Sequence, residues 1–168
     1  LLTEARRPAR LGPDGELVLL PDQDRSRWDR VLIAEGHDLV RRCLRRNRPG
    51  PYQIQAAINA VHTHGVATDW SQVLALYDQL YRLVPTPVVA LNRAVAVAEV
   101  HGPAVALAAL AEVDLPGYHL LPATRADLLA RLDRRGEAVA AYDEAIALAG
   151  TETERSFLRD RRGRVEDK

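Results

Sequence analysis

The chain has 168 residues, of which 47% are hydrophobic and 27% charged, a composition typical of one folded globular domain rather than a disordered chain. Its 23 basic residues balance 23 acidic residues, which disfavours a free-standing binder of nucleic acid or of a membrane surface. The single cysteine, Cys43, excludes an intrachain disulfide, and no apolar run is long enough to span a membrane, so we expect a cytoplasmic protein.

Residues 1–50 predict a linker, a turn segment and a capping helix. The Asp14-Gly15 turn signal is followed by an apolar run, so a short hairpin near residues 11–20 is one interpretation. From about Ser26, apolar residues recur every three or four positions, which predicts a helix that ends near residues 46–51. Cys43 lies on the apolar stripe of this helix, and we expect a buried core thiol rather than a reactive one.

Residues 51–152 show an internal period of 34 residues, the period of tetratricopeptide repeats. The third unit resembles that family best, because Ala138, Tyr142 and Ala145 have its small–aromatic–small spacing. One period earlier, the same columns hold Ala104, Ala108 and Ala111. We expect three degenerate units, near 51–84, 85–118 and 119–152. The alternative is an ordinary helical bundle in which the 34-residue similarity arises by chance.

The predicted fold class is all-α, a right-handed tetratricopeptide-like array of helix–turn–helix units with flanking capping helices. Residues 153–168 predict the C-terminal capping helix, with its arginines outward. Asp69 is expected to cap one helix, and Thr151 with Glu154 forms a capping-box pattern before the last. Stacked repeats leave their ends open, which explains why such caps are needed.

Catalytic and metal-binding patterns are absent from the sequence, so we expect no enzyme, no cofactor and no metal site. His62 and His64 are two residues apart, and their side chains diverge on a helix. The alternating Asp and Arg residues of Asp22–Asp29 predict a salt-bridged loop and helix cap. A small-ligand sensor or enzyme with a pocket near Asp22–Asp29 is the alternative.

A protein-binding groove is the favoured functional interpretation. In a tetratricopeptide array the first helix of each unit lines the groove, and transferring that register selects polar and charged side chains suited to a peptide backbone or a carboxylate. The candidates are Tyr52, Gln55, Asn59, His62, Arg93, Asp127 and Arg131. For Asn92-Arg93, which interrupts an apolar helix, a structural role and a binding role remain equally open.

Two strings carry a family resemblance: Asp22-Gln23-Asp24-Arg25-Ser26-Arg27-Trp28-Asp29 and Pro87-Val88-Val89-Ala90-Leu91-Asn92-Arg93-Ala94. The chain resembles the C-terminal, tetratricopeptide-like extension of bacterial extracytoplasmic-function sigma factors, which belong to the sigma-70 family. The resemblance marks a family-motif loop made of Asp22, Gln23, Asp24, Arg25, Trp28 and Asp29. It also implies that the sigma domains precede Leu1, which fits a chain without methionine.

The resemblance implies a regulatory protein-interaction domain that acts in transcription initiation. The expected partners are the sigma domains in cis, core RNA polymerase or a regulatory protein. Contact with DNA is expected only through the preceding domains.

Overall fold

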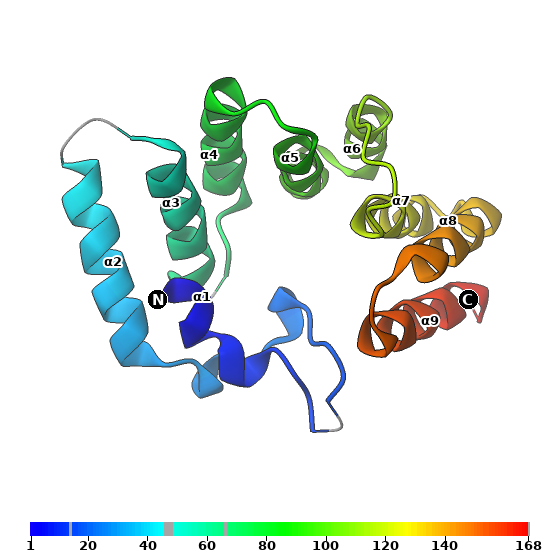
Figure 1. Cartoon of the computed structure of the whole chain (residues 1–168), viewed down its shortest axis with the longest axis horizontal. Coiled ribbons are helices and arrows are strands. Elements are labelled where there is room, and N and C mark those ends of the chain that lie inside the picture. Colours follow the sequence, from blue (N-terminus) through cyan, green and yellow to red (C-terminus); the bar gives the residue numbers. More distant parts are fainter. Residues whose placement is uncertain (14, 46–48, 66, 168) are drawn as a thin grey trace. The chain divides into compact units, whose positions relative to one another are not determined.

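Helices and turns make up the described fold (Figure 1). The computed structural model describes residues 1–13, 15–45, 49–65 and 67–167, and none of these segments forms a β-strand. The α-helices in this part of the chain are α1 (Leu2–Ala5), α2 (Arg30–Leu44), α3 (Pro51–Thr63), α4 (Trp70–Leu83), α5 (Pro87–His101), α6 (Pro103–Leu110), α7 (Leu120–Arg131), α8 (Arg135–Leu148) and α9 (Glu152–Glu166). Three 3₁₀ turns lie before α2: η1 (Arg7–Ala9), η2 (Leu20–Asp22) and η3 (Arg25–Arg27). The expected all-α fold is confirmed.

The chain divides into two units, formed by residues 1–85 and 86–168. In the first unit, α1 packs against α2 and α3, α2 against α3, and α3 against α4. In the second unit, each helix from α5 to α8 packs against the helix that follows it. Within each unit the helices therefore pack on their sequence neighbours, as expected for an array. The right-handed sense, the boundaries at 50 and 152, and the equivalence of the helix pairs stay predictions.

The segment between η1 and η2 forms a single turn. One isolated antiparallel bridge joins Leu11 to Leu17, so the expected short hairpin is reduced to this bridge. Gly15 has a φ of 79°, a left-handed conformation that glycine adopts without strain. Asp14, the other half of the turn signal, lies outside the described residues. Pro21, inside η2, lacks the amide that a longer ladder would need.

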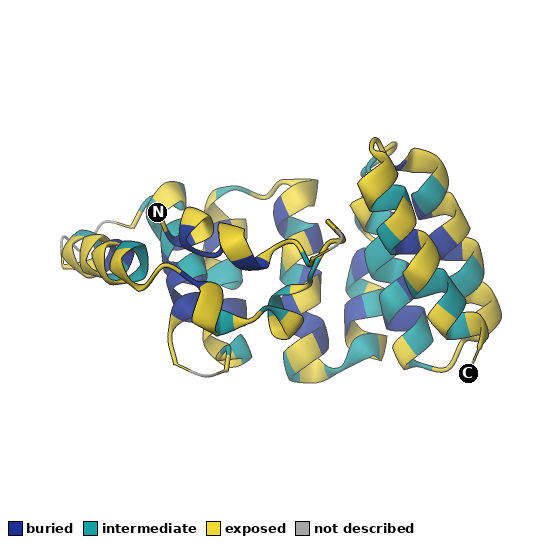
Figure 2. Ribbon diagram, turned by 90° about the horizontal axis from the view of Figure 1, so that it is seen from below, coloured by how far each residue is buried: buried dark blue, intermediate teal, exposed yellow. Residues whose placement is uncertain are grey.

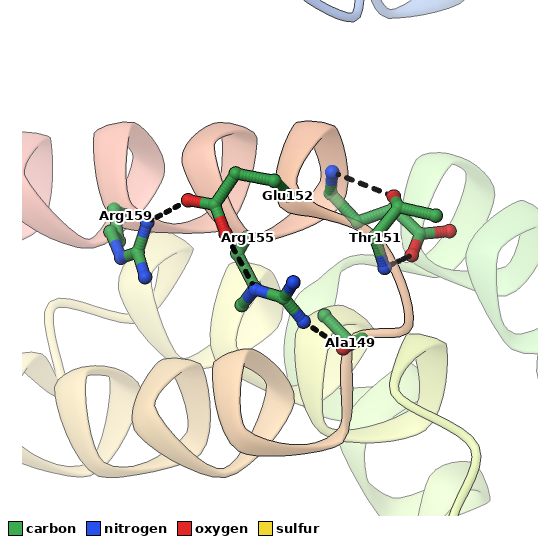
Figure 3. A network of polar contacts seen from close by, with 6 residues as sticks. Ala149, Thr151, Glu152, Arg155 and Arg159 are labelled. Carbon is green, nitrogen blue, oxygen red and sulfur yellow. Dashed lines mark hydrogen bonds and ion pairs between the residues drawn. The ribbon is translucent and has the colours of Figure 1, made fainter.

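Side-chain caps begin two helices at the residues that the sequence indicates. The Asp69 carboxylate accepts a hydrogen bond from the Gln72 amide at 3.0 Å. At α9, the Thr151 hydroxyl accepts from the Glu154 amide at 3.2 Å, and the Glu154 carboxylate accepts from the Thr151 amide at 3.0 Å (Figure 3). Both predicted caps are confirmed, and they satisfy amides that a helix start leaves unpaired. The predicted helix end at residues 46–48 lies outside the described part of the chain.

The first turns of α9 also carry an ion-pair network, drawn in Figure 3. The Glu152 carboxylate accepts hydrogen bonds from Arg155 at 2.8 Å and from Arg159 at 2.6 Å. Arg155 in turn donates to the carbonyl of Ala149 at 2.7 Å, and Ala149 is the C-cap residue of α8. The network therefore connects the start of α9 to the end of the preceding helix.

The core of the second unit lies where α7, α8 and α9 meet. Ala138, Tyr142 and Ala145 of α8 are buried together with Leu129 of α7 and Leu158 of α9. Figure 2 shows buried residues in dark blue along the packed sides of the helices. The small–aromatic–small spacing therefore marks the packed face of α8, because small side chains allow neighbouring helices to approach closely.

The 34-residue period predicts that Ala104, Ala108 and Ala111 take the packed positions of α6, and this prediction is wrong. Ala104, Ala108 and Ala111 are exposed, whereas Ala106 and Leu110 are buried. Ala111 falls beyond the last residue of this eight-residue helix. Within the helix, the buried pair Ala106 and Leu110 is displaced by two positions from the predicted Ala104 and Ala108, and at about 3.6 residues per turn this displacement places the buried face on the opposite side of the helix.

We expect Thr151→Ala to lower the free energy of unfolding by about 1 kcal/mol, because the Glu154 amide loses its cap. Urea denaturation followed by circular dichroism measures the change. Thr153→Ala is the matched control, since Thr153 is exposed inside α9 and alanine favours a helix interior. Equal losses in the two variants would contradict the role of the cap.

Candidate functional site

Two carboxylates of the family-motif loop begin helices. Asp24 accepts a hydrogen bond from the Ser26 amide at 2.9 Å and starts η3. Asp29 accepts from the Val31 and Leu32 amides at 2.9 and 3.0 Å and starts α2. The predicted helix cap is therefore confirmed. Both carboxylates are engaged by backbone amides, which makes them part of the scaffold.

The other polar side chains of the loop connect it to neighbouring segments. Gln23 donates to the Val18 carbonyl at 3.2 Å, and Arg25 donates to the Gly65 carbonyl at 2.8 Å. The Arg25 guanidinium also lies 4.7 Å from the centroid of the buried Trp28 ring, a cation–π contact. Among the described residues, no ion pair joins the carboxylates of this loop to its arginines, so the predicted salt-bridged loop is wrong. Backbone groups and an aromatic ring take the place of the expected partners.

A buried arginine lies in the turn after α1. Only 8% of the surface of Arg6 is exposed, and its guanidinium donates to the Asn59 side-chain oxygen at 3.2 Å. His62, three residues after Asn59 on α3, packs edge-on against Trp70 with ring centroids 5.4 Å apart. Burial, together with the nearby charges of Arg6 and Arg25, lowers the pKa of His62 to about 4. His62 is therefore neutral at pH 7.

A groove of about 390 Å³ lies on the first unit, between α1, α2 and α3. It contains two of the predicted binding residues, Tyr52, which is 82% exposed, and Asn59, whose side-chain oxygen accepts from the Thr3 hydroxyl at 3.4 Å. Cys43 also lines the groove and is half-buried, so the expected buried core thiol is wrong. The remaining walls are mostly apolar and include Leu1, Leu2, Leu39, Val40 and Ala56.

A second cleft, of about 340 Å³, lies on the second unit between α7, α8 and α9. Asp127 and Arg131, both predicted as binding residues, line it. Arg161 of α9 pairs with the Asp127 carboxylate and donates to the Tyr142 hydroxyl at 3.4 Å. Arg131 pairs with Glu99 of α5 at 2.7 Å. This arginine cleft therefore joins predicted residues of α7 to a side chain of the last helix.

Positive charge exceeds negative charge in the arginine cleft. Arg135 pairs with Asp133 at 2.7 Å, and Arg164 is exposed at the edge. A lining of this kind favours an oxyanion, because the planar guanidinium matches the geometry of a carboxylate. The charged lining residues are Asp127, Arg131, Asp133, Arg135, Arg161 and Arg164.

The other predicted residues lie outside the lining of the groove and the cleft. Gln55 is exposed on α3, and its carbonyl accepts from the Asn59 amide group at 3.0 Å. Arg93 is half-buried on α5 in the second unit, and Asp22 is exposed in η2. His62 packs against Trp70 instead of lining the groove. The predicted set is therefore divided between the two units.

Two arginines, the buried Arg6 of the first unit and Arg161 of the arginine cleft, were not among the predicted binding residues. Arg6 lies in a short charged segment without periodicity, and no sequence signal distinguishes it from its exposed neighbours. Arg161 was expected to face outward, yet it is half-buried in the arginine cleft. A signal for Arg161 exists, because it follows Asp127 by 34 residues, one full period. The same column of the sequence contains Arg93 one period before Asp127 and Asn59 two periods before it.

The described residues contain no group of three or more His, Cys, Asp or Glu side chains placed to hold a metal ion. His62 packs on Trp70, whereas the ring of His64 lies 5.7 Å from that of His37, so the two histidines diverge as predicted. In the same part of the chain, no helix has the length and apolar character needed to cross a membrane.

Comparisons with known proteins relate this chain to sequences without an assigned activity. Residues 1–44, from α1 to the last residue of α2, match the family of unknown function DUF6596. Over 164 residues the chain is 45% identical to the uncharacterized protein R00370 of Rhizobium meliloti (strain 1021). The match covers 95% of this chain and 39% of the relative, so the chain spans well under half of that protein's length.

The lowered pKa of His62 predicts a pH dependence. Its folded-state pKa, about 4, lies below the usual 6.5, so its contribution to stability is complete above about pH 6.5 and is lost as the pH falls toward 4. We expect His62→Gln to reduce the loss of unfolding free energy between pH 7 and pH 5 by about 1–2 kcal/mol. Urea denaturation at both pH values measures it. His101→Gln, at an exposed position, is the control, and an identical pH dependence in all three proteins would refute the assignment.

Proposed function

We propose that this chain is the protein-binding regulatory region of an alternative sigma factor that acts in transcription initiation. The sequence support is the resemblance of its strings to the C-terminal extension of extracytoplasmic-function sigma factors. The much greater length of the Rhizobium relative fits a region that works as part of a larger protein. The partners proposed are the sigma domains in cis, core RNA polymerase or a regulatory protein.

The observation that carries this proposal is the arginine cleft of the second unit. Its side chains come from three successive helices, which is how repeat arrays present a binding surface. Asp127 and Arg161 are 34 residues apart in the sequence and pair with each other, which supports a common register of polar groups on the two helices. The excess of arginine over aspartate favours an acidic protein segment as the occupant.

A small-ligand sensor or enzyme built on Asp22–Asp29 has less support. The Asp24 and Asp29 carboxylates accept hydrogen bonds from backbone amides at helix starts, and Trp28 is buried. Acid–base or ligand-binding chemistry would require these carboxylates to face a substrate. A protein-binding role needs only the exposed surfaces that the two units provide.

We expect Arg164→Glu to weaken binding of the chain to its sigma domains or to core RNA polymerase by about fivefold, because the reversal repels an acidic partner. Surface plasmon resonance with purified partners measures the affinity. Arg82→Glu applies the same charge change to an exposed position on α4, in the other unit, and is expected to bind as the wild type does. Equal affinity of the wild type, Arg164→Glu and Arg82→Glu would show that the cleft is not part of the interface.

A further inference from the structure

Arg6 is a buried cation without a carboxylate partner. It is 92% buried, and its Nε atom has no hydrogen-bond partner among the described residues. Its guanidinium donates a side-chain hydrogen bond to a neutral acceptor, the Asn59 side-chain oxygen, at 3.2 Å. Arginine stays protonated in proteins, and buried charges are normally paired, so this arrangement calls for an explanation.

The charges that act on this cluster are all positive. Burial, Arg10 and Arg25 lower the pKa of Arg6, and burial, Arg6 and Arg25 lower that of His62. The Asp24 and Asp29 carboxylates of the adjacent loop accept hydrogen bonds from backbone amides, and among the described residues no ion pair joins either of them to Arg6 or Arg25. The cluster therefore brings two guanidinium cations, Arg6 before η1 and Arg25 of η3, together with the neutral imidazole of His62 on α3 in a partly desolvated environment.

Two members of the cluster keep part of their surface open to solvent. Arg25 and His62 are half-buried, unlike Arg6. One guanidinium nitrogen of Arg25 donates to the Gly65 carbonyl at 2.8 Å. The guanidinium group has further N–H donors. The His62 ring lies 3.4 Å from the Thr68 hydroxyl, on the side of α4. An approaching anion would meet Arg25 and His62 first and be attracted by the buried charge of Arg6.

We propose that Arg6, Arg25 and His62 form an oxyanion-binding site on the first unit. A bound oxyanion supplies the negative charge that the cluster lacks and accepts hydrogen bonds from guanidinium N–H groups. A carboxylate and a phosphate share this chemistry. The site is separate from the arginine cleft and does not depend on the function proposed for it.

The test follows the pKa of His62 by NMR in the complete 168-residue chain. The pH titration is run in sodium chloride alone, and then with sodium trifluoroacetate, a carboxylate that stays ionised at pH 4, or sodium phosphate added at the same ionic strength. A nearby anion stabilises the protonated ring, so we expect the pKa of His62 to rise from about 4 by about 0.5–1 unit with at least one of the two anions. A parallel titration of His62→Gln is the reference and identifies the His62 signal.

Variants separate a binding role from a structural one. Arg25→Gln should abolish the anion-dependent shift, whereas Arg30→Gln, at an exposed position of α2, should keep it. Arg6→Leu should also abolish the shift, and without anion it should melt no lower than the wild type, because an unpaired buried charge is removed. If Arg6→Leu does not fold, Arg25→Gln still decides the question.

Each outcome of the titration has a defined meaning. A shift with trifluoroacetate identifies a carboxylate as an accepted ligand, and a shift with phosphate alone identifies a phosphate group. No shift beyond the sodium chloride control would overturn the proposal and leave ordered water as the partner of Arg6. A shift of equal size in the wild type, Arg25→Gln and Arg6→Leu would overturn it as well.

Discussion

Each helix of this protein buries its apolar face against helices that are close in sequence, and the rest of the structure depends on that constraint. The last helix, α9, packs on α8, so other interactions must also hold it. At the C-terminal edge, α9 contributes Leu158 to the core and begins with a capping box. At the N-terminal side, the Asp29 amide donates to the Ala5 carbonyl at 2.9 Å, which ties the start of α2 to the end of α1.

The same constraint determines where binding surfaces can form. Because packing uses the apolar faces, polar side chains remain available at the surface, and on the second unit Asp127 of α7 pairs with Arg161 of α9. The first unit differs, since Arg6, in the turn after α1, is buried beside Asn59. We therefore propose two kinds of site for negative charge, an open cleft on the second unit and a desolvated cluster on the first.

Local sequence signals predicted the helices and their caps well, because a cap such as Asp69 or Thr151 depends on residues a few positions away. The period of 34 predicted the packed face of α8 but failed on α6, where the buried residues lie two positions away from the predicted ones and therefore on the opposite face of the helix. Of the candidate site, Asp127 and Arg131 were predicted. Arg6 was not, because its burial arises from the tertiary contacts of α1 with α2 and α3, which no local pattern encodes.

The central claim is that this chain regulates transcription initiation by binding protein rather than by catalysis. Reconstituted transcription tests it most directly, with core RNA polymerase and a sigma factor that carries this chain, compared with the same protein lacking residues 1–168. The account predicts that the truncated protein still binds promoter DNA through its sigma domains but gives a clearly changed amount of promoter-dependent RNA, and that adding the separate chain in trans shifts that amount back. Equal RNA synthesis with and without residues 1–168 would contradict the account.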